Sequence, residues 1–152
     1  MEKPTHEQAQ LQLELFETRR EARLRQARDW FQKNYFVESF EEAMRVAAPG
    51  TEAGTNAMMV ASYWDQVCAM LNYELLHEQL FFETNGEFLM VWERLKPMVD
   101  GFREEFAAKH FLAHFEKVAG RYEEWMEKTS PGHVARIREF MTQMRGQMTK
   151  AA

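Results

Sequence analysis

The chain has 152 residues, of which 45% are hydrophobic and 28% are charged, and its formal net charge is −5. This length suits one folded domain with one core, and the composition excludes a disordered chain. The negative charge argues against a general nucleic-acid binder, because phosphate backbones are bound through dense positive surfaces.

Helix-forming residues dominate the chain, whereas turn residues are scarce, with 7 Gly and 4 Pro. The sequence therefore predicts an all-α protein, a single domain over residues 1–152 built as a compact bundle of five or six helices. Cys68 is the only cysteine, which excludes an intramolecular disulfide, and its apolar neighbours indicate a buried side chain. Since no apolar run is long enough for a membrane span or a signal sequence, we expect a cytoplasmic location.

The first predicted helix covers residues 5–33, where no Gly or Pro occurs and apolar residues recur near the helical period. It is amphipathic and longer than a small bundle needs, which gives it the length to protrude or to form a dimer. Its arginines alternate with acidic residues, which is typical of a solvated helix face; the alternative is an electrostatic docking strip for nucleic acid or an acidic partner. These arginines are Arg19, Arg20, Arg23, Arg25 and Arg28.

A short helix and a loop precede the centre of the chain. The sequence from Ser39 to Glu42 fits a capping box, so we expect a helix from there to about Ala47. Residues 49–54 contain one Pro and two Gly and predict a loop. The most apolar helix should then cover residues 55–82.

Three further helices complete the prediction. A turn and capping box at residues 84–87 should start a helix in which Pro97 causes a kink or a break, because proline lacks the amide hydrogen. Apolar residues spaced 4-3-4-3 over residues 111–125 predict a helix packed along a partner. Ser130 and Pro131 should start the last helix, whose methionine stripe fills the core or, alternatively, forms an adaptable docking surface.

Two carboxylates fall near the buried side of the central helix when its residues are projected at about 100° each. Glu78 falls inside the apolar arc, and Glu74 lies just outside its edge. A buried carboxylate needs a cation or hydrogen-bond donors, because an unpaired buried charge costs several kcal/mol. We expect a structural polar cluster in which Arg103 supplies the cation, and Asn72 finds a partner of its own.

A metal site is the competing hypothesis for the same part of the chain. Glu74 and His77 have the Glu-x-x-His spacing of two ligands on one helix face, Glu78 is adjacent, and His110 and His114 form an i,i+4 pair. A di-metal bundle site requires two Glu-x-x-His elements, and this chain has one. We therefore favour an ion-pair network without a cofactor. No nucleophile or nucleotide-binding motif is present, so the sequence gives no positive sign of catalysis.

A Leu-Asn-aromatic-Glu stretch at residues 71–74, a Trp-x-x-Leu-x-Pro segment at residues 92–97 and then Arg103 follow one another along the chain. This pattern, over Leu71 to Arg103, resembles an uncharacterised prokaryotic helical family, domain of unknown function 4760. The resemblance implies an all-helical fold and no known activity. It also implies one structural cluster of Asn72, Glu74, Trp92 and Arg103. Many members of that family resemble proteins tethered by an apolar N-terminal helix, whereas residues 1–33 here are charged, which argues against a membrane role.

Taken together, these features predict a non-catalytic protein-interaction or regulatory module that can self-associate through its first helix. One alternative is a metal- or small-ligand-binding bundle that uses the acidic and histidine residues named above. The other is recognition of nucleic acid or an acidic partner by the arginine-rich helix.

Overall fold

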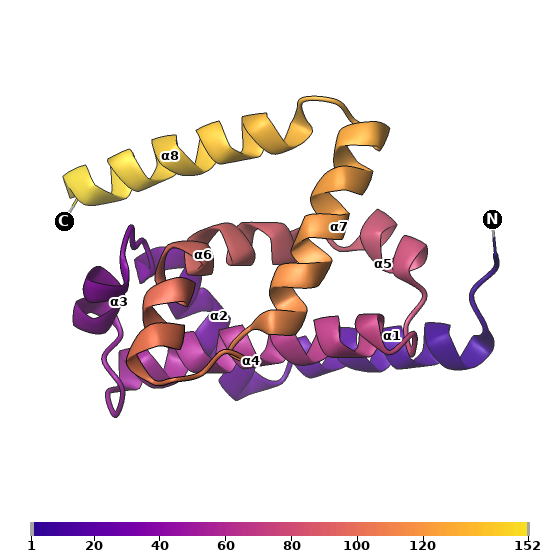
Figure 1. Cartoon of the computed structure of the whole chain (residues 1–152), viewed down its shortest axis with the longest axis horizontal. Helices are drawn as coiled ribbons and strands as arrows, with labels where there is room; N and C mark the ends of the chain where they lie inside the picture. The colour runs from indigo at the N-terminus through magenta and orange to yellow at the C-terminus, as the bar shows by residue number, and fades with distance from the viewer. Residues whose placement is uncertain (1, 152) are drawn as a thin grey trace.

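Eight helices and no strand make up residues 2–151, the part of the chain that the computed structural model describes (Figure 1). The helices are α1 (His6–Arg19), α2 (Ala22–Asn34), α3 (Phe40–Val46), α4 (Glu52–Asn72), α5 (Glu78–Thr84), α6 (Glu87–Glu105), α7 (Ala113–Thr129) and α8 (His133–Ala151). The all-α prediction is confirmed. The count of five or six helices is wrong, because two of the predicted helices are each divided in two.

The first division separates α1 from α2 at Arg20 and Glu21, so the single helix predicted over residues 5–33 is wrong. The Glu21 carboxylate accepts hydrogen bonds from the backbone N–H groups of Arg23 and Leu24, both at 2.9 Å, and caps the start of α2. These two hydrogen bonds lower the pKa of Glu21. Glutamate is not among the preferred N-cap residues, so the sequence carries no clear signal for this break.

The second division ends α4 at Asn72, ten residues before the predicted end of the central helix. Glu74 adopts a left-handed conformation with φ of 59°. The N–H of Glu74 donates to the carbonyl of Leu71 and that of Leu75 to Met70, which is a Schellman motif. This motif usually has Gly at the position of Glu74. Leu75, which follows this break, is 55% exposed.

The start of α4 also differs from the prediction. Thr51 caps the helix by accepting from the N–H of Gly54, so α4 begins at Glu52, inside the predicted loop. A Cβ atom at Gly54 would collide with the carbonyl oxygen of Ala48. Glycine therefore lets the loop after α3 pack directly on α4.

The later helices follow the prediction with different caps. α6 continues through Pro97, and its N-cap is Gly86, without a side-chain hydrogen bond, so the capping box predicted at residues 84–87 is absent. Ser130 caps the end of α7 instead of the start of α8. The stripe predicted over residues 111–125 is confirmed, since Phe115, Val118, Ala119 and Tyr122 are the buried residues of α7.

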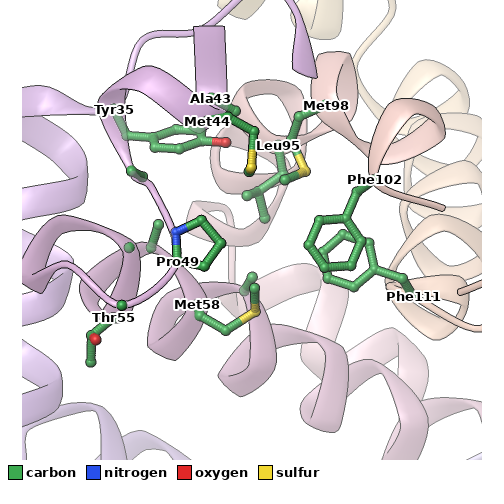
Figure 2. A pocket seen from close by; sticks show the side chains of 15 residues that line it. Tyr35, Ala43, Met44, Pro49, Thr55, Met58, Leu95, Met98, Phe102 and Phe111 are labelled. Carbon is green, nitrogen blue, oxygen red and sulfur yellow. The ribbon is translucent and has the colours of Figure 1, made fainter. Parts of the chain in front are cut away.

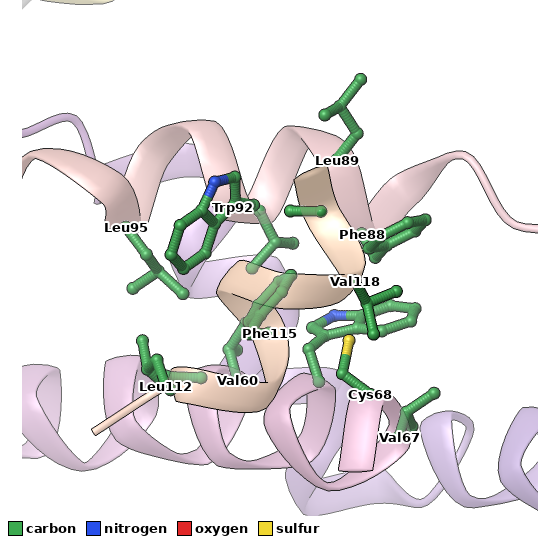
Figure 3. Packing of buried hydrophobic residues seen from close by; sticks show 14 of the residues in the cluster. Val60, Val67, Cys68, Phe88, Leu89, Trp92, Leu95, Leu112, Phe115 and Val118 are labelled. Carbon is green, nitrogen blue, oxygen red and sulfur yellow. The ribbon is translucent and has the colours of Figure 1, made fainter. Parts of the chain in front are cut away.

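The core lies where α4, α6 and α7 meet (Figure 3). Phe88 of α6 contacts Tyr122 of α7, with ring centroids 4.6 Å apart, and Trp92 lies 5.1 Å from Phe115. Burying each such side chain contributes roughly 1.5–3 kcal/mol. Cys68 is fully buried in this cluster, as predicted, and burial raises the pKa of its thiol.

α8 extends away from this core. In Figure 1 it returns from the end of α7 across the top of the molecule, above α6. None of the helices in residues 2–151 combines the length and hydropathy needed to cross a membrane.

Candidate functional site

Two of the predicted polar residues meet at the junction of α4, α5 and α7, around a cation that the sequence analysis missed. Arg121 of α7 donates to the Glu78 carboxylate through Nε at 2.9 Å and Nη2 at 2.7 Å. The same Nη2 lies 2.8 Å from Oδ1 of Asn72, whose amide nitrogen is 2.9 Å from Nδ1 of His114. The Arg121 and Glu78 side chains are 40% and 39% exposed, so this cluster lies at the surface.

Arg103 and Glu74 are not part of this cluster, and the predicted Arg103–Glu74 ion pair is wrong. The end of α4 turns Glu74 outward, where it is exposed and its carbonyl lies 3.5 Å from Nε2 of Gln8. Arg103 instead donates from Nε to the carbonyl of Phe111 at 2.9 Å and pairs with Glu116 at 3.3 Å. The cause is the break after Asn72, which changes the helical phase on which the prediction depended.

Trp92 also lies elsewhere, since it packs in the core against Phe115. The cluster of four residues that the family resemblance implied is therefore not formed, since Glu74 is exposed after the end of α4 and the other three have different contacts. Arg103 joins α6 to the turn before α7, Trp92 fills the core, and Asn72 binds Arg121.

Three of the five residues proposed for a metal site, His77, Glu78 and His114, have partners of their own. His77 caps α5 by accepting from the N–H of Leu80 at 3.1 Å, and its Nε2 lies 2.7 Å from the carbonyl of Glu2. His110 is exposed before the start of α7, and His114 faces Asn72. Within residues 2–151, no three His, Cys, Asp or Glu side chains are close enough together to hold a metal ion.

The arginine-rich segment is only partly a solvated face. Arg19 and Arg28 turn inward and both bind Glu87, at 3.1 Å and 2.7 Å, next to the start of α6. The guanidinium of Arg19 also lies over the ring of Trp64, 5.4 Å from its centroid. These arginines hold α1 and α2 against α6, so they are structural.

Of the other three arginines of the segment, one is also structural and two are exposed. Arg23 donates to Oδ1 of the buried Asn56 at 2.8 Å and joins α2 to α4. Arg20 and Arg25 are exposed. Only two of the five arginines therefore point outward, too few for a continuous cationic strip along this segment.

The surface of α1 carries exposed apolar residues beside a groove. Leu13 is 62% exposed and Phe16 is 49% exposed, and they lie one turn apart on α1. They border a cavity of about 310 Å³ between α1, α4 and the end of α5. Tyr63, Trp64, Val67 and Phe81 contribute to its inner wall. Arg19 is the only buried residue of α1, which places most of this helix at the surface.

Comparison with known proteins gives one family. The model of an uncharacterised family, described as domain of unknown function DUF4760, matches residues 4–122. The match covers α1 to α6 and the first part of α7, which is longer than the 71–103 segment that carries the sequence resemblance. No curated protein and no solved structure matches the chain significantly.

Proposed function

The chain belongs to the DUF4760 family, whose description assigns no function, and we propose that it is a non-catalytic interaction module that self-associates through α1. The observation that carries the proposal is the pair of exposed apolar side chains, Leu13 and Phe16, on the edge of the groove between α1, α4 and α5. Removing large apolar side chains from water is favourable, so an exposed pair of them marks a surface that a partner can cover.

The groove and the two side chains lie on the same face of each molecule, which suits a twofold arrangement. In such a dimer the same patch is used on both copies, so the Phe16 ring of each copy enters the groove of the other. The groove is lined by aromatic and aliphatic side chains, including Trp64 and Phe81, which match an inserted aromatic ring.

The charges along α1 and α2 support an antiparallel arrangement of the two copies. Of the exposed acidic residues, Glu7 precedes the apolar pair, Glu14 lies between its two members and Glu17 directly follows it, and the exposed Arg20 and Arg25 come after all three. An antiparallel contact places the acidic half of one copy beside the basic half of the other. Such complementarity mainly fixes orientation and speeds association.

The proposal is tested by light scattering coupled to size-exclusion chromatography over a wide range of protein concentrations. We expect a concentration-dependent dimer for the unchanged chain. The double variant Leu13→Glu/Phe16→Glu should be monomeric, because each dimer would bury four carboxylates in an apolar contact. Both positions are exposed, so the monomer should keep its helical circular dichroism and its thermal midpoint.

The matched control is Gln10→Glu/Thr18→Glu, which adds the same charge at exposed positions of α1 outside the apolar pair. This control should dimerise as the unchanged chain does. A chain that is monomeric at every concentration, or a Leu13→Glu/Phe16→Glu variant that dimerises normally, would contradict self-association through α1.

A further inference from the structure

A second cavity lies at the other end of α4, between α3, α4 and α6, and has a volume of about 240 Å³ (Figure 2). Its lining is mostly apolar and has no charged residue; of its two polar side chains, Tyr35 and Thr55, the Thr55 hydroxyl already donates to the carbonyl of Thr51. Leu95, Met98 and Phe102 of α6 form one side, and Met58 of α4 lies at the rim, where it is 41% exposed.

One polar group points into this cavity. Tyr35 follows α2 directly and is 1% exposed, with its ring stacked on Phe31 at a centroid distance of 4.7 Å. Figure 2 shows its hydroxyl oxygen directed into the space beside Met44 and Leu95. This hydroxyl has no hydrogen-bond partner among residues 2–151.

The hydroxyl oxygen opens onto the cavity, since it is not among the side-chain atoms that are both closed off from solvent and without a hydrogen-bond partner. Its hydrogen-bond partner therefore comes from whatever occupies the cavity, either water or a ligand. Burial, with the nearby carboxylate of Glu42, raises the pKa of Tyr35. The hydroxyl therefore keeps its proton and is available as a donor.

We infer that this cavity binds a small neutral aromatic molecule of one or two rings, whose single carbonyl or hydroxyl oxygen accepts a hydrogen bond from Tyr35. This site is separate from the α1 surface and does not depend on self-association.

The size and the walls of the cavity select this class of ligand. An apolar cavity of about 150 Å³ holds a benzene molecule, so about 240 Å³ gives space for a second ring. Phe102 and Phe111 are stacked, with centroids 3.9 Å apart, and form a flat aromatic wall. Figure 2 shows the thioethers of Met44, Met58 and Met98 around the same space. Thioether sulfur packs favourably against aromatic rings.

The lining also explains why the ligand is neutral. A carboxylate or an ammonium group in this cavity would lose its hydration without meeting an opposite charge. The negative charge of Glu42 near Tyr35 disfavours an anion further. One hydrogen bond and an apolar surface are the recognition elements that remain.

The test compares 1-indanone, a bicyclic ketone, with indane, the same ring system without the oxygen. Titrations are followed by the methionine methyl signals in ¹H–¹³C NMR spectra of the full chain. We expect 1-indanone to shift the signals of Met44, Met58 and Met98, which line the cavity, and to leave the Met148 signal unchanged. Indane should bind the same place more weakly.

Tyr35→Phe keeps the ring and removes the hydroxyl. It should weaken 1-indanone binding about fivefold, as expected for one hydrogen bond, and leave indane binding unchanged. Ala47→Leu extends a side chain that lines the cavity, and it should weaken both ligands by about tenfold or more. Circular dichroism and thermal unfolding establish that each variant is folded.

The inference is overturned if neither compound shifts the signals of the three lining methionines. It is also overturned if Tyr35→Phe binds 1-indanone as tightly as the unchanged chain, because the cavity would then take apolar molecules without recognising an oxygen. Should Tyr35→Phe fail to fold, the comparison of 1-indanone with indane, together with Ala47→Leu, decides the question by the same criteria.

Discussion

The guanidinium of Arg28 binds the carboxylate of Glu87 in a bidentate contact, since Nε lies 3.1 Å from Oε1 and Nη2 lies 2.7 Å from Oε2. Arg19 adds a third nitrogen at 3.1 Å on the same carboxylate. One acidic residue at the start of α6 thus holds the end of α1 and the middle of α2. Because the side chains of Arg28 and Glu87 are 21% and 22% exposed, solvent screens this contact only partly.

Glu87→Gln should therefore destabilise the fold by about 2–4 kcal/mol, somewhat less than the loss for a fully buried pair, because two partly buried guanidinium groups lose their anion. Urea unfolding followed by circular dichroism measures the change. Glu17→Gln is the control, since Glu17 pairs with Arg20 at a site where both side chains are about two-thirds exposed. The control should lie within about 0.5 kcal/mol of the unchanged chain. Equal effects for the two variants would contradict a structural role for Glu87.

The fold class and most of the core could be predicted from the sequence because helical periodicity is a local property. The spacing of apolar residues was enough to predict the buried stripe of α7, and the apolar neighbours of Cys68 were enough to predict that its side chain is buried. The two helix breaks were missed because their capping residues are unusual. Glu21 caps α2 and Glu74 takes the left-handed position, whereas the patterns that mark such places favour Ser, Thr, Asp, Asn or Gly.

The candidate site was harder to predict because it depends on which helices are neighbours. Asn72 and Glu78 were both expected to have partners, but Glu78 was also expected to be buried and is 39% exposed, and Arg121, which contacts both, lies more than forty residues further along the chain. Helix pairing decides whether Arg103 or Arg121 supplies the cation, and one sequence contains no direct signal for it. The hydroxyl of Tyr35 was missed for the same reason, since its cavity forms only when α3, α4 and α6 come together.

Arg103 should stabilise the connection between α6 and α7 even though it does not pair with Glu74. Its Nε donates to the carbonyl of Phe111, and its Nη1 lies 3.3 Å from Glu116. Arg103→Ala leaves that carbonyl without its donor, and we expect a loss of about 1–3 kcal/mol in the free energy of unfolding. Arg103→Lys should recover little of the lost stability, because an ammonium group lacks the fixed, planar set of N–H donors of the guanidinium.

The control for Arg103 is Lys109→Ala, an exposed cation in the turn before α7. Thermal and urea unfolding of the three variants provide the comparison. If Arg103→Ala has the stability of Lys109→Ala, the hydrogen bond to Phe111 contributes nothing measurable to the fold.

Tyr63 should make the protein sensitive to alkaline pH. Its hydroxyl donates to the carbonyl of Leu15 at 2.7 Å and fixes α1 on α4. Burial is the main cause that raises the pKa of Tyr63 from 10.0 to about 12, and Arg19 and Arg28 partly oppose the increase. The folded pKa lies above the unfolded value, so this contribution to stability is complete below pH 10 and is lost as the pH rises toward about 12.

Unfolding free energies measured at several pH values check this expectation. Tyr63→Phe should lose about 1 kcal/mol at neutral pH, because one hydrogen bond is missing, and its stability should then fall less steeply between pH 10 and 12 than that of the unchanged chain. Parallel curves for the two proteins across this range would show that Tyr63 is not the group responsible.

α8 should separate from the rest of the protein more easily than the other long helices, because ion pairs account for much of its attachment. Val134 is its only buried residue among those whose side chains are described. The guanidinium of Arg138 on α8 pairs with Glu93 of α6 at 2.8 Å and with Glu123 of α7 at 2.9 Å. Hydrogen bonds to these two carboxylates raise the pKa of the Arg138 guanidinium, and the bond to Glu93 has the larger effect.

Arg138→Ala should therefore increase amide hydrogen exchange throughout α8 while α4 and α6 stay protected. Loss of this partly exposed bridge should lower the global stability by no more than about 1–2 kcal/mol. Hydrogen exchange with mass spectrometry resolves the helices, and Arg136→Ala, at an exposed position of α8, is the control. If exchange in α4 rises as much as in α8, α8 unfolds together with the core instead of separating from it. Protection of α8 at the control level in Arg138→Ala would mean that apolar contacts, such as that of Val134, hold this helix in place.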